Sequence, residues 1–134
     1  MANLVVTKTI HGSCKMYELV LPFPPSSNTY YRRSKHSTYM SAKGRQFSKD
    51  VSAILKQLML DNESLSERLS VTLELSAPTK RKFDIDNRAK GTLDALQKAG
   101  LFIDDEQIDR LLIKRLPVDQ EKKGYCVVKI DVIT

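Results

Sequence analysis

The 134-residue sequence contains few side chains that bind soft metals: two cysteines and two histidines. Cys14 and Cys126 lie far apart and form no CxxC pair, so we expect two free thiols in a reducing compartment. A structural zinc site needs about four ligands, and His11 and His36 show no zinc-ligand spacing relative to the cysteines. The sequence therefore argues against a zinc protein and against a disulfide-stabilised one.

Long apolar runs are also absent. No run approaches the roughly 20 residues that a membrane-spanning helix requires. The N-terminal stretch MANLVVTKTIHGSCK has no signal-peptide core, so we expect no membrane association and a cytoplasmic location. With 41% hydrophobic and 28% charged residues, the composition is that of a globular protein, and the length suits one domain, residues 1–134.

One region of the sequence is rich in basic residues and contains no acidic ones. No Asp or Glu occurs between Leu19 and Lys49, a region in which basic residues alternate with aromatic ones such as Tyr30 and Tyr31. Together with the net charge of +6, this pattern favours a nucleic acid, since basic side chains contact phosphates and aromatic rings stack on unpaired bases. The alternative is a solvated basic surface with the tyrosines packed against the sheet.

The hydrophobic periodicity predicts an α+β fold, with a mixed sheet and two main helices packed on it. Ser41 is the expected N-cap of the first helix, and Gly100 is expected to end the second. Residues 1–14 are expected to be a loosely held leader. The predicted order is a strand at 16–21, a hairpin formed by 29–32 and 38–40, a helix at 41–60, a strand at 69–75, a helix ending before 100, and strands at 108–118 and 125–133.

Four carboxylates fall in two tight groups, Asp84 with Asp86 and Asp104 with Asp105. If the first group lies in an extended segment, both of its side chains point the same way, because alternate residues of a strand share a face. The intervening helix and the short apolar run after Gly100 would return the chain toward that group. Hard carboxylate oxygens of this kind suit Mg²⁺.

Clustered carboxylates repel one another, and on a basic nucleic-acid-binding surface they make sense only around a cation. A divalent metal there could polarise a phosphodiester and activate water. Lys90 follows Asp86 by four residues, so on a shared helix face its ammonium could neutralise charge on the phosphate. This arrangement describes metal-dependent phosphodiester hydrolysis.

Simpler interpretations of the same residues remain open. Asp84 or Asp86 could be a helix cap, and Asp86 with Lys90 a surface ion pair. Asp94 is expected to be solvated or a helper, and one member of the Asp104–Asp105 pair is expected to be structural. A calcium-binding EF-hand loop does not fit, because alanines stand at the positions of its required glycine and terminal glutamate.

Two separate motifs point to a known family. The stretch DIDNRAKGTLDALQKAGLFIDDEQI and the earlier LPFPPSSNTYYR together resemble the RusA family of Holliday-junction resolvases, over residues 17–133. The resemblance implies a RusA-like fold and a small homodimeric, Mg²⁺-dependent endonuclease of bacterial or phage origin, with Mn²⁺ as a possible substitute. It also implies a branched DNA substrate, a four-way junction cut by paired symmetric nicks during recombination and repair. Residues 1–15 extend beyond the family pattern.

By position, Asp84, Asp86 and Asp105 match the family's catalytic metal-binding aspartates, and Lys90 matches its essential lysine. The motif positions expected to play supporting roles are Asn87, Asp94 and Asp104. The residues expected to bind DNA are Arg32, Arg33, Lys35, Lys43, Arg45, Lys80, Arg81, Lys82 and Arg88. The alternatives are a non-catalytic DNA-binding or regulatory protein and a metal nuclease that acts on other branched nucleic acids. Tyr30, Tyr31 and Phe23 are left between DNA contacts and a dimer core.

Overall fold

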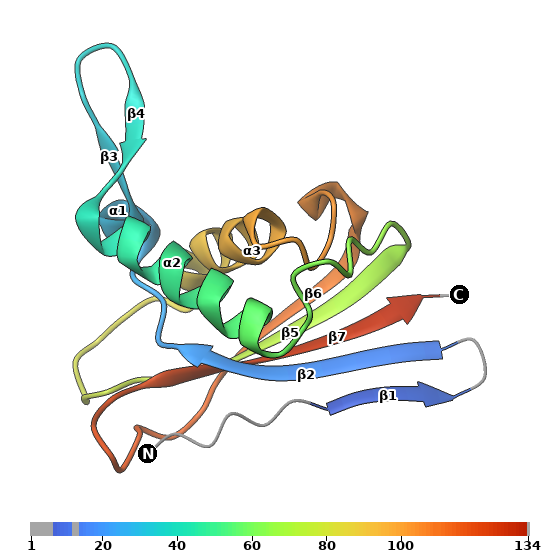
Figure 1. Ribbon diagram of the computed structural model, residues 1–134. Coiled ribbons are helices and arrows are strands. Elements are labelled where there is room, and N and C mark those ends of the chain that lie inside the picture. The colour runs from blue at the N-terminus through green and yellow to red at the C-terminus, as the bar shows by residue number, and fades with distance from the viewer. Residues whose placement is uncertain (1–6, 12–13, 134) are drawn as a thin grey trace.

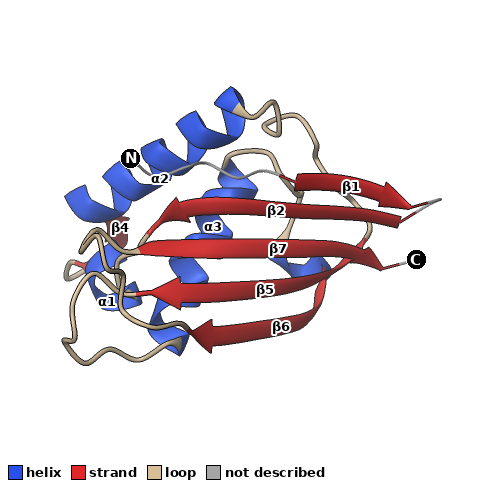
Figure 2. Cartoon of the chain, turned by 90° about the horizontal axis from the view of Figure 1, so that it is seen from below, coloured by secondary structure: helices blue, strands red, loops and turns tan. Residues whose placement is uncertain are grey.

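The computed structural model describes residues 7–11 and 14–133, and its centre is a five-stranded sheet in the order β1-β2-β7-β5-β6. The strands are β1 (Thr7–His11), β2 (Cys14–Pro22), β5 (Arg68–Ser76), β6 (Ile108–Arg115) and β7 (Tyr125–Ile133). Strands β5 and β6 pair in parallel, and the other pairs are antiparallel. Two helices, α2 (Ala42–Gln57) and α3 (Ala89–Lys98), pack on one face of the sheet (Figures 1 and 2). The predicted α+β class with a mixed sheet is confirmed.

The two faces of the sheet differ as alternation along a strand requires. On β5, Val71, Leu73 and Leu75 are fully buried beneath the helices. Glu74 points to the opposite face, where Lys114 of β6 lies 3.4 Å away and Lys129 of β7 lies 3.2 Å away. The apolar face therefore supplies the core, and the open face is covered by cross-strand ion pairs.

Both main helices have the ends that the sequence predicts. The Ser41 side chain accepts a hydrogen bond from the backbone N–H of Gly44, at 3.0 Å, and so caps α2. At the end of α3, Gly100 adopts φ +96, and the N–H of Leu101 reaches the carbonyl of Leu96, at 3.2 Å. Among the described residues no helix is long and apolar enough to cross a membrane.

Tyr30 packs between the two helices and is only 1% exposed. A Cβ on Gly44 of α2 would lie 2.4 Å from the Tyr30 carbonyl oxygen, and a Cβ on Gly91 of α3 would lie 2.6 Å from the Tyr30 ring. Both helices therefore carry a glycine at their contact with Tyr30, and the missing side chain allows Tyr30 to pack closely against the helix backbone. Tyr30 is a core residue.

A two-stranded hairpin, β3 (Tyr31–Arg33) and β4 (Thr38–Met40), projects from the body of the molecule (Figure 1). We call residues 31–40 the basic arm. The predicted strand at 29–32 is wrong at its start, because residues up to Tyr30 form a short helix, α1 (Ser27–Tyr30). Ser26 caps this helix by accepting the N–H of Thr29 at 3.2 Å, an interaction that competes with strand formation.

Two other predicted boundaries change. Thr7–His11 is not part of a loose leader but pairs in register with β2 as an edge strand. The predicted strand at 108–118 ends at Arg115, close to Pro117, which has no N–H to continue a ladder. Residues 1–6 and 12–13 lie outside the described part of the chain.

Candidate active site

The first acidic pair lies in a bend rather than in a strand. Ile85 adopts helical angles, φ −66 and ψ −34, and its carbonyl accepts the N–H of Arg88 at 3.2 Å. Asp86 opens a single 3-10 turn, η1 (Asp86–Arg88), that runs directly into α3. The expectation that Asp84 and Asp86 share the face of an extended strand is therefore wrong. Ile85 still packs against the core, as predicted, and both aspartates remain exposed.

One face of α3 carries the predicted lysine. Lys90 Nζ lies 3.2 Å from Oδ2 of Asp94, one turn further along the helix. The same oxygen accepts a hydrogen bond from the hydroxyl of Tyr31, at the base of the basic arm. Burial and this bond to a carboxylate raise the pKa of Tyr31, so the phenol stays protonated and donates. Asp94 is thus the acceptor for two donors.

The two members of the second acidic pair have different roles, because Asp104 caps a turn and Asp105 stays exposed. Asp104 caps a short 3-10 turn, η2 (Asp105–Gln107), by accepting the N–H of Glu106 at 3.1 Å. The backbone N–H of Asp105 is held by the side chain of Gln97 on α3, at 3.2 Å. As predicted, one of the two adjacent aspartates is structural, and the carboxylate of Asp105 is left exposed.

Asp105 lies within electrostatic reach of the α3 face that bears Lys90. A hydrogen bond with Asp104 raises the pKa of Asp105, and partial burial and the charges of Asp104 and Asp94 act in the same direction. The charge of Lys90 opposes this effect. Asp105 therefore feels the charges of both Lys90 and Asp94, but only Lys90 and Asp94 are in contact.

The donor set matches Mg²⁺ in chemistry. Asp84, Asp86 and Asp105 offer exposed carboxylate oxygens, the hard ligands that Mg²⁺ takes in proteins. Within the described residues, however, no three His, Cys, Asp or Glu side chains lie close enough together to hold one ion. The carboxylates are therefore ligands of the right chemical type for Mg²⁺, but they do not form a preassembled cluster.

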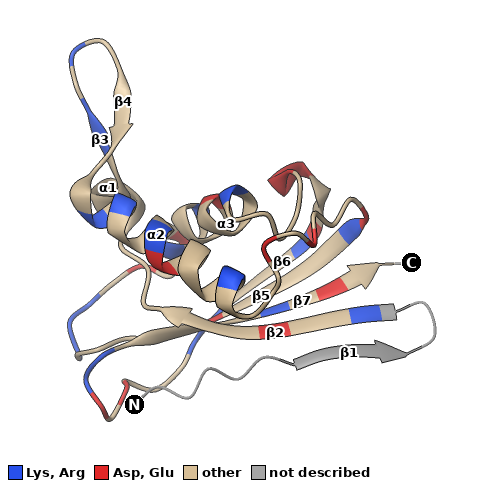
Figure 3. Ribbon diagram, viewed as in Figure 1, with Lys and Arg blue, Asp and Glu red and all other residues tan. Residues whose placement is uncertain are grey.

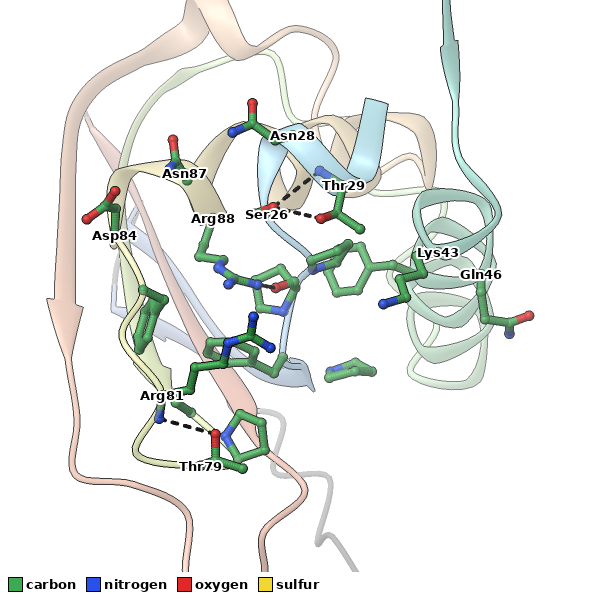
Figure 4. A pocket seen from close by; sticks show the side chains of 18 of the residues that line it. Ser26, Asn28, Thr29, Lys43, Gln46, Thr79, Arg81, Asp84, Asn87 and Arg88 are labelled. Atoms are coloured by element: carbon green, nitrogen blue, oxygen red, sulfur yellow. Dashed lines mark hydrogen bonds between the residues drawn. The ribbon is translucent and has the colours of Figure 1, made fainter. Parts of the chain in front are cut away.

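A cleft of about 800 Å³ opens beside Asp84 (Figure 4). Its walls are the proline-rich segment 22–25, the first turns of α2, and the loop 77–84 that follows β5. Lys43 and Arg81 reach into it from opposite sides, and Asp84 and Asn87 lie at its rim. Cations therefore line the cleft that opens beside Asp84.

Exposed cations also occupy the basic arm and the loop after β5 (Figure 3). The side chains of Arg32, Arg33 and Lys35 take part in none of the ion pairs found among the described residues, and the same holds for the three cations of the loop, Lys80, Arg81 and Lys82. They are free to contact phosphates. Arg45 is exposed but donates to the carbonyl of Met40, at 2.7 Å.

Arg88 differs from the other predicted DNA-binding residues, because its guanidinium is already engaged. It lies 4.9 Å from the ring centroid of Phe23 and 5.4 Å from that of Phe83, and it donates to the carbonyl of Pro24 at 2.7 Å. Burial lowers its pKa, and its Nε has no partner. Arg88 thus ties the proline-rich segment to the loop that carries Asp84.

The structure gives the position of the three aromatic residues whose role the sequence left open. Tyr30 is core, Tyr31 bonds Asp94, and Phe23 packs edge-to-face on Phe83 with ring centroids 5.3 Å apart. Phe83 has a further neighbour, Arg115 of β6, that the sequence did not single out. No local pattern joins residues 32 positions apart.

Comparison with known proteins identifies the family of this α+β chain. The family Endodeoxyribonuclease RusA matches residues 22–131 of the chain. The chain belongs to this family, and the resemblance seen in its sequence is confirmed.

Its relatives carry the same description. The chain is 46% identical, over 86% of its length and 96% of the relative's, to the crossover junction endodeoxyribonuclease rusA of Enterobacteria phage HK97. It is 38% identical, over 76% of its length and 84% of the relative's, to the crossover junction endodeoxyribonuclease RusA of Escherichia coli K12. A solved structure, the OmpA-like domain of FopA1 from Francisella tularensis, matches with 17% identity, 98% and 83% coverage, and a TM-score of 0.37, too low to bear on the fold.

Proposed function

We propose that this protein is a metal-dependent, structure-selective endodeoxyribonuclease that resolves four-way DNA junctions by paired symmetric nicks. The observation that carries the proposal is the set of exposed carboxylates, Asp84, Asp86 and Asp105, in a chain whose basic arm and loop after β5 carry exposed cations. Membership of the RusA family, whose relatives are named crossover junction endodeoxyribonucleases, supports the reaction and the substrate.

The carboxylates that would hold Mg²⁺ are those of Asp84, Asp86 and Asp105. When bound, the ion supplies positive charge that polarises a phosphoryl oxygen and lowers the pKa of water. Lys90 sets its ammonium beside the phosphate and offsets the charge that builds up there during in-line attack by water. Mn²⁺, which takes the same oxygen ligands, is a possible substitute.

The DNA surface in this proposal consists of the basic arm and the loop after β5. Arg32, Arg33 and Lys35 of the arm and Lys80, Arg81 and Lys82 of the loop would hold duplex arms through phosphates, with Lys43 and Arg45 between them. Binding of this kind weakens steeply as salt rises, since each phosphate contact releases a counterion. A flat salt response would argue against these segments as the DNA surface.

A homodimer completes the proposal, because two equivalent sites can serve two equivalent strands of a junction. The outermost strand β6 supports a self-association surface. It has no strand on its outer side among the described residues, and Leu111 and Leu112 remain 42% and 38% exposed. Sedimentation should give twice the chain mass, and Leu112→Asp should shift it toward the monomer.

The test uses a labelled synthetic four-way junction with Mg²⁺, and symmetric nicks are expected. Asp84→Asn and Asp105→Asn should abolish cutting while junction binding survives. Asp131→Asn, an exposed aspartate of β7 away from the helices, is the matched control and should cut normally. Binding without metal-dependent nicking in the parent chain would favour a non-catalytic DNA-binding protein. Preferential cutting of flaps or RNA would favour a nuclease for other branched substrates.

A further inference from the structure

Three residues from two distant segments meet at a single oxygen. The Tyr31 hydroxyl donates to Oδ2 of Asp94, and Lys90 Nζ lies 3.2 Å from that oxygen and 5.8 Å from the centroid of the Tyr31 ring. The Lys90 ammonium therefore lies near both a carboxylate and an aromatic ring, and both groups attract a cation.

This arrangement is more restrained than an ordinary surface pair. The Lys90 side chain is 65% exposed, whereas that of Asp94 is 27% exposed. A helical i, i+4 pair alone is worth only about 0.3–0.5 kcal/mol and leaves the lysine mobile. The Tyr31 hydroxyl fixes the orientation of the Asp94 carboxylate, and that orientation determines where the ammonium rests.

The Tyr31 ring is itself anchored. Its neighbour Tyr30, with ring centroids 4.7 Å apart, is clamped between α2 and α3 at Gly44 and Gly91. Tyr31 is also the first residue of β3, directly before Arg32 and Arg33 on the basic arm. The base of the arm and the end of the Lys90 side chain are thus connected through one hydrogen-bonded carboxylate.

We propose that Tyr31 and Asp94 are positioning residues that hold the Lys90 ammonium beside the Asp94 carboxylate and set its place relative to DNA held by the arm. The proposal rests on the proposed function, since it assumes that Lys90 supports phosphodiester cleavage. Tyr31 and Asp94 touch neither substrate nor metal in this role and act through Lys90.

The test measures single-turnover cleavage and junction affinity separately. Tyr31→Phe keeps the ring and removes the hydroxyl, so cleavage should slow by roughly 2- to 10-fold, the rate equivalent of one hydrogen bond, with unchanged affinity. Asp94→Asn should slow it further. Tyr125→Phe is the matched control, because Tyr125 begins β7, outside the basic arm, the loop after β5 and α3, and should cleave at the parent rate.

The decisive comparison is made in a Lys90→Ala background. If Tyr31 acts through Lys90, Tyr31→Phe should cause no additional loss there. An equal loss in both backgrounds would show a general structural role and overturn the inference, as would a parent-like rate for Tyr31→Phe alone. If Lys90→Ala itself cut normally, the role given to Lys90 in the proposed function would fail instead. Thermal melting of each variant verifies that the fold persists.

Discussion

The guanidinium of Arg115 lies 4.2 Å from the ring centroid of Phe83 and donates a 2.9 Å hydrogen bond to the Phe83 carbonyl. Arg115 comes from β6, while Phe83 directly precedes Asp84. With Arg88 on the same ring, Phe83 is contacted by two cations. Phe83, which directly precedes Asp84, is therefore held by contacts with strand β6 and with the turn before α3.

Arg115→Met should loosen this attachment, because methionine keeps an apolar chain but lacks the charge and the donor. An exposed cation–π contact is worth about 0.5–1 kcal/mol, so we expect a loss of unfolding free energy of about 1 kcal/mol. Cleavage should fall by more than junction affinity, since Asp84 moves with Phe83. Arg110→Met, on the same strand, is the control. Equal losses of stability and cleavage in the two variants would contradict the role of Arg115 in holding Phe83.

Arg88→Gln should act on stability rather than on the electrostatics of DNA binding. Its hydrogen bond to Pro24 joins residues 64 positions apart, and a bond from a charged donor contributes about 1.5–3 kcal/mol. Arg33→Gln, on the exposed arm, should instead leave unfolding unchanged and reduce the salt dependence of binding by about one phosphate contact. Denaturant titration and binding at several salt concentrations distinguish the two. A reduced salt slope for Arg88→Gln at unchanged stability would identify it as a phosphate contact.

Gly91→Ala should destabilise the protein, against the usual trend. In a helix interior, Ala is favoured over Gly by about 0.5–1 kcal/mol, but overpacking costs about 1–3 kcal/mol. The added Cβ would lie 2.6 Å from the Tyr30 ring, so the second effect should win. Urea unfolding measures the change. In combination with Tyr30→Leu, the loss should be smaller than the sum of the single losses, and a net gain for Gly91→Ala alone would contradict the clamp.

Sequence patterns predicted those helices and strands whose conformation depends on residues close by in the chain. The apolar stripe of Phe47, Val51 and Leu55 predicted α2, and Gly100 predicted the end of α3, since each depends on neighbours a few positions away. The edge strand β1 did not follow from its own pattern. Its conformation comes from backbone pairing with β2, which no periodicity within residues 1–14 reveals.

The candidate site was predictable in its residue types and less so in its geometry. Alternation of polar and apolar residues at Asp84, Ile85 and Asp86 is the same for a strand as for the start of a helix. The outcome was decided by packing of Ile85 on the core and by the turn that carries Asp86. The bond from Tyr31 to Asp94 spans 63 positions, and such contacts arise only once the helices and the arm are assembled.

Cys126 should resist alkylation in the native protein. Its thiol is fully buried, and burial raises its pKa to about 12, so it stays neutral at pH 9, whereas an unfolded thiol ionises near about 8.5. Because the folded-state pKa is the higher one, this contribution to stability is complete below the unfolded pKa and declines as the pH rises above it. Iodoacetamide labelling of a Cys14→Ser variant at pH 9, followed by mass spectrometry, should be slow without denaturant and fast in concentrated urea. Rapid labelling without urea would mean that β7 opens readily and that Cys126 is not sealed beneath the helices.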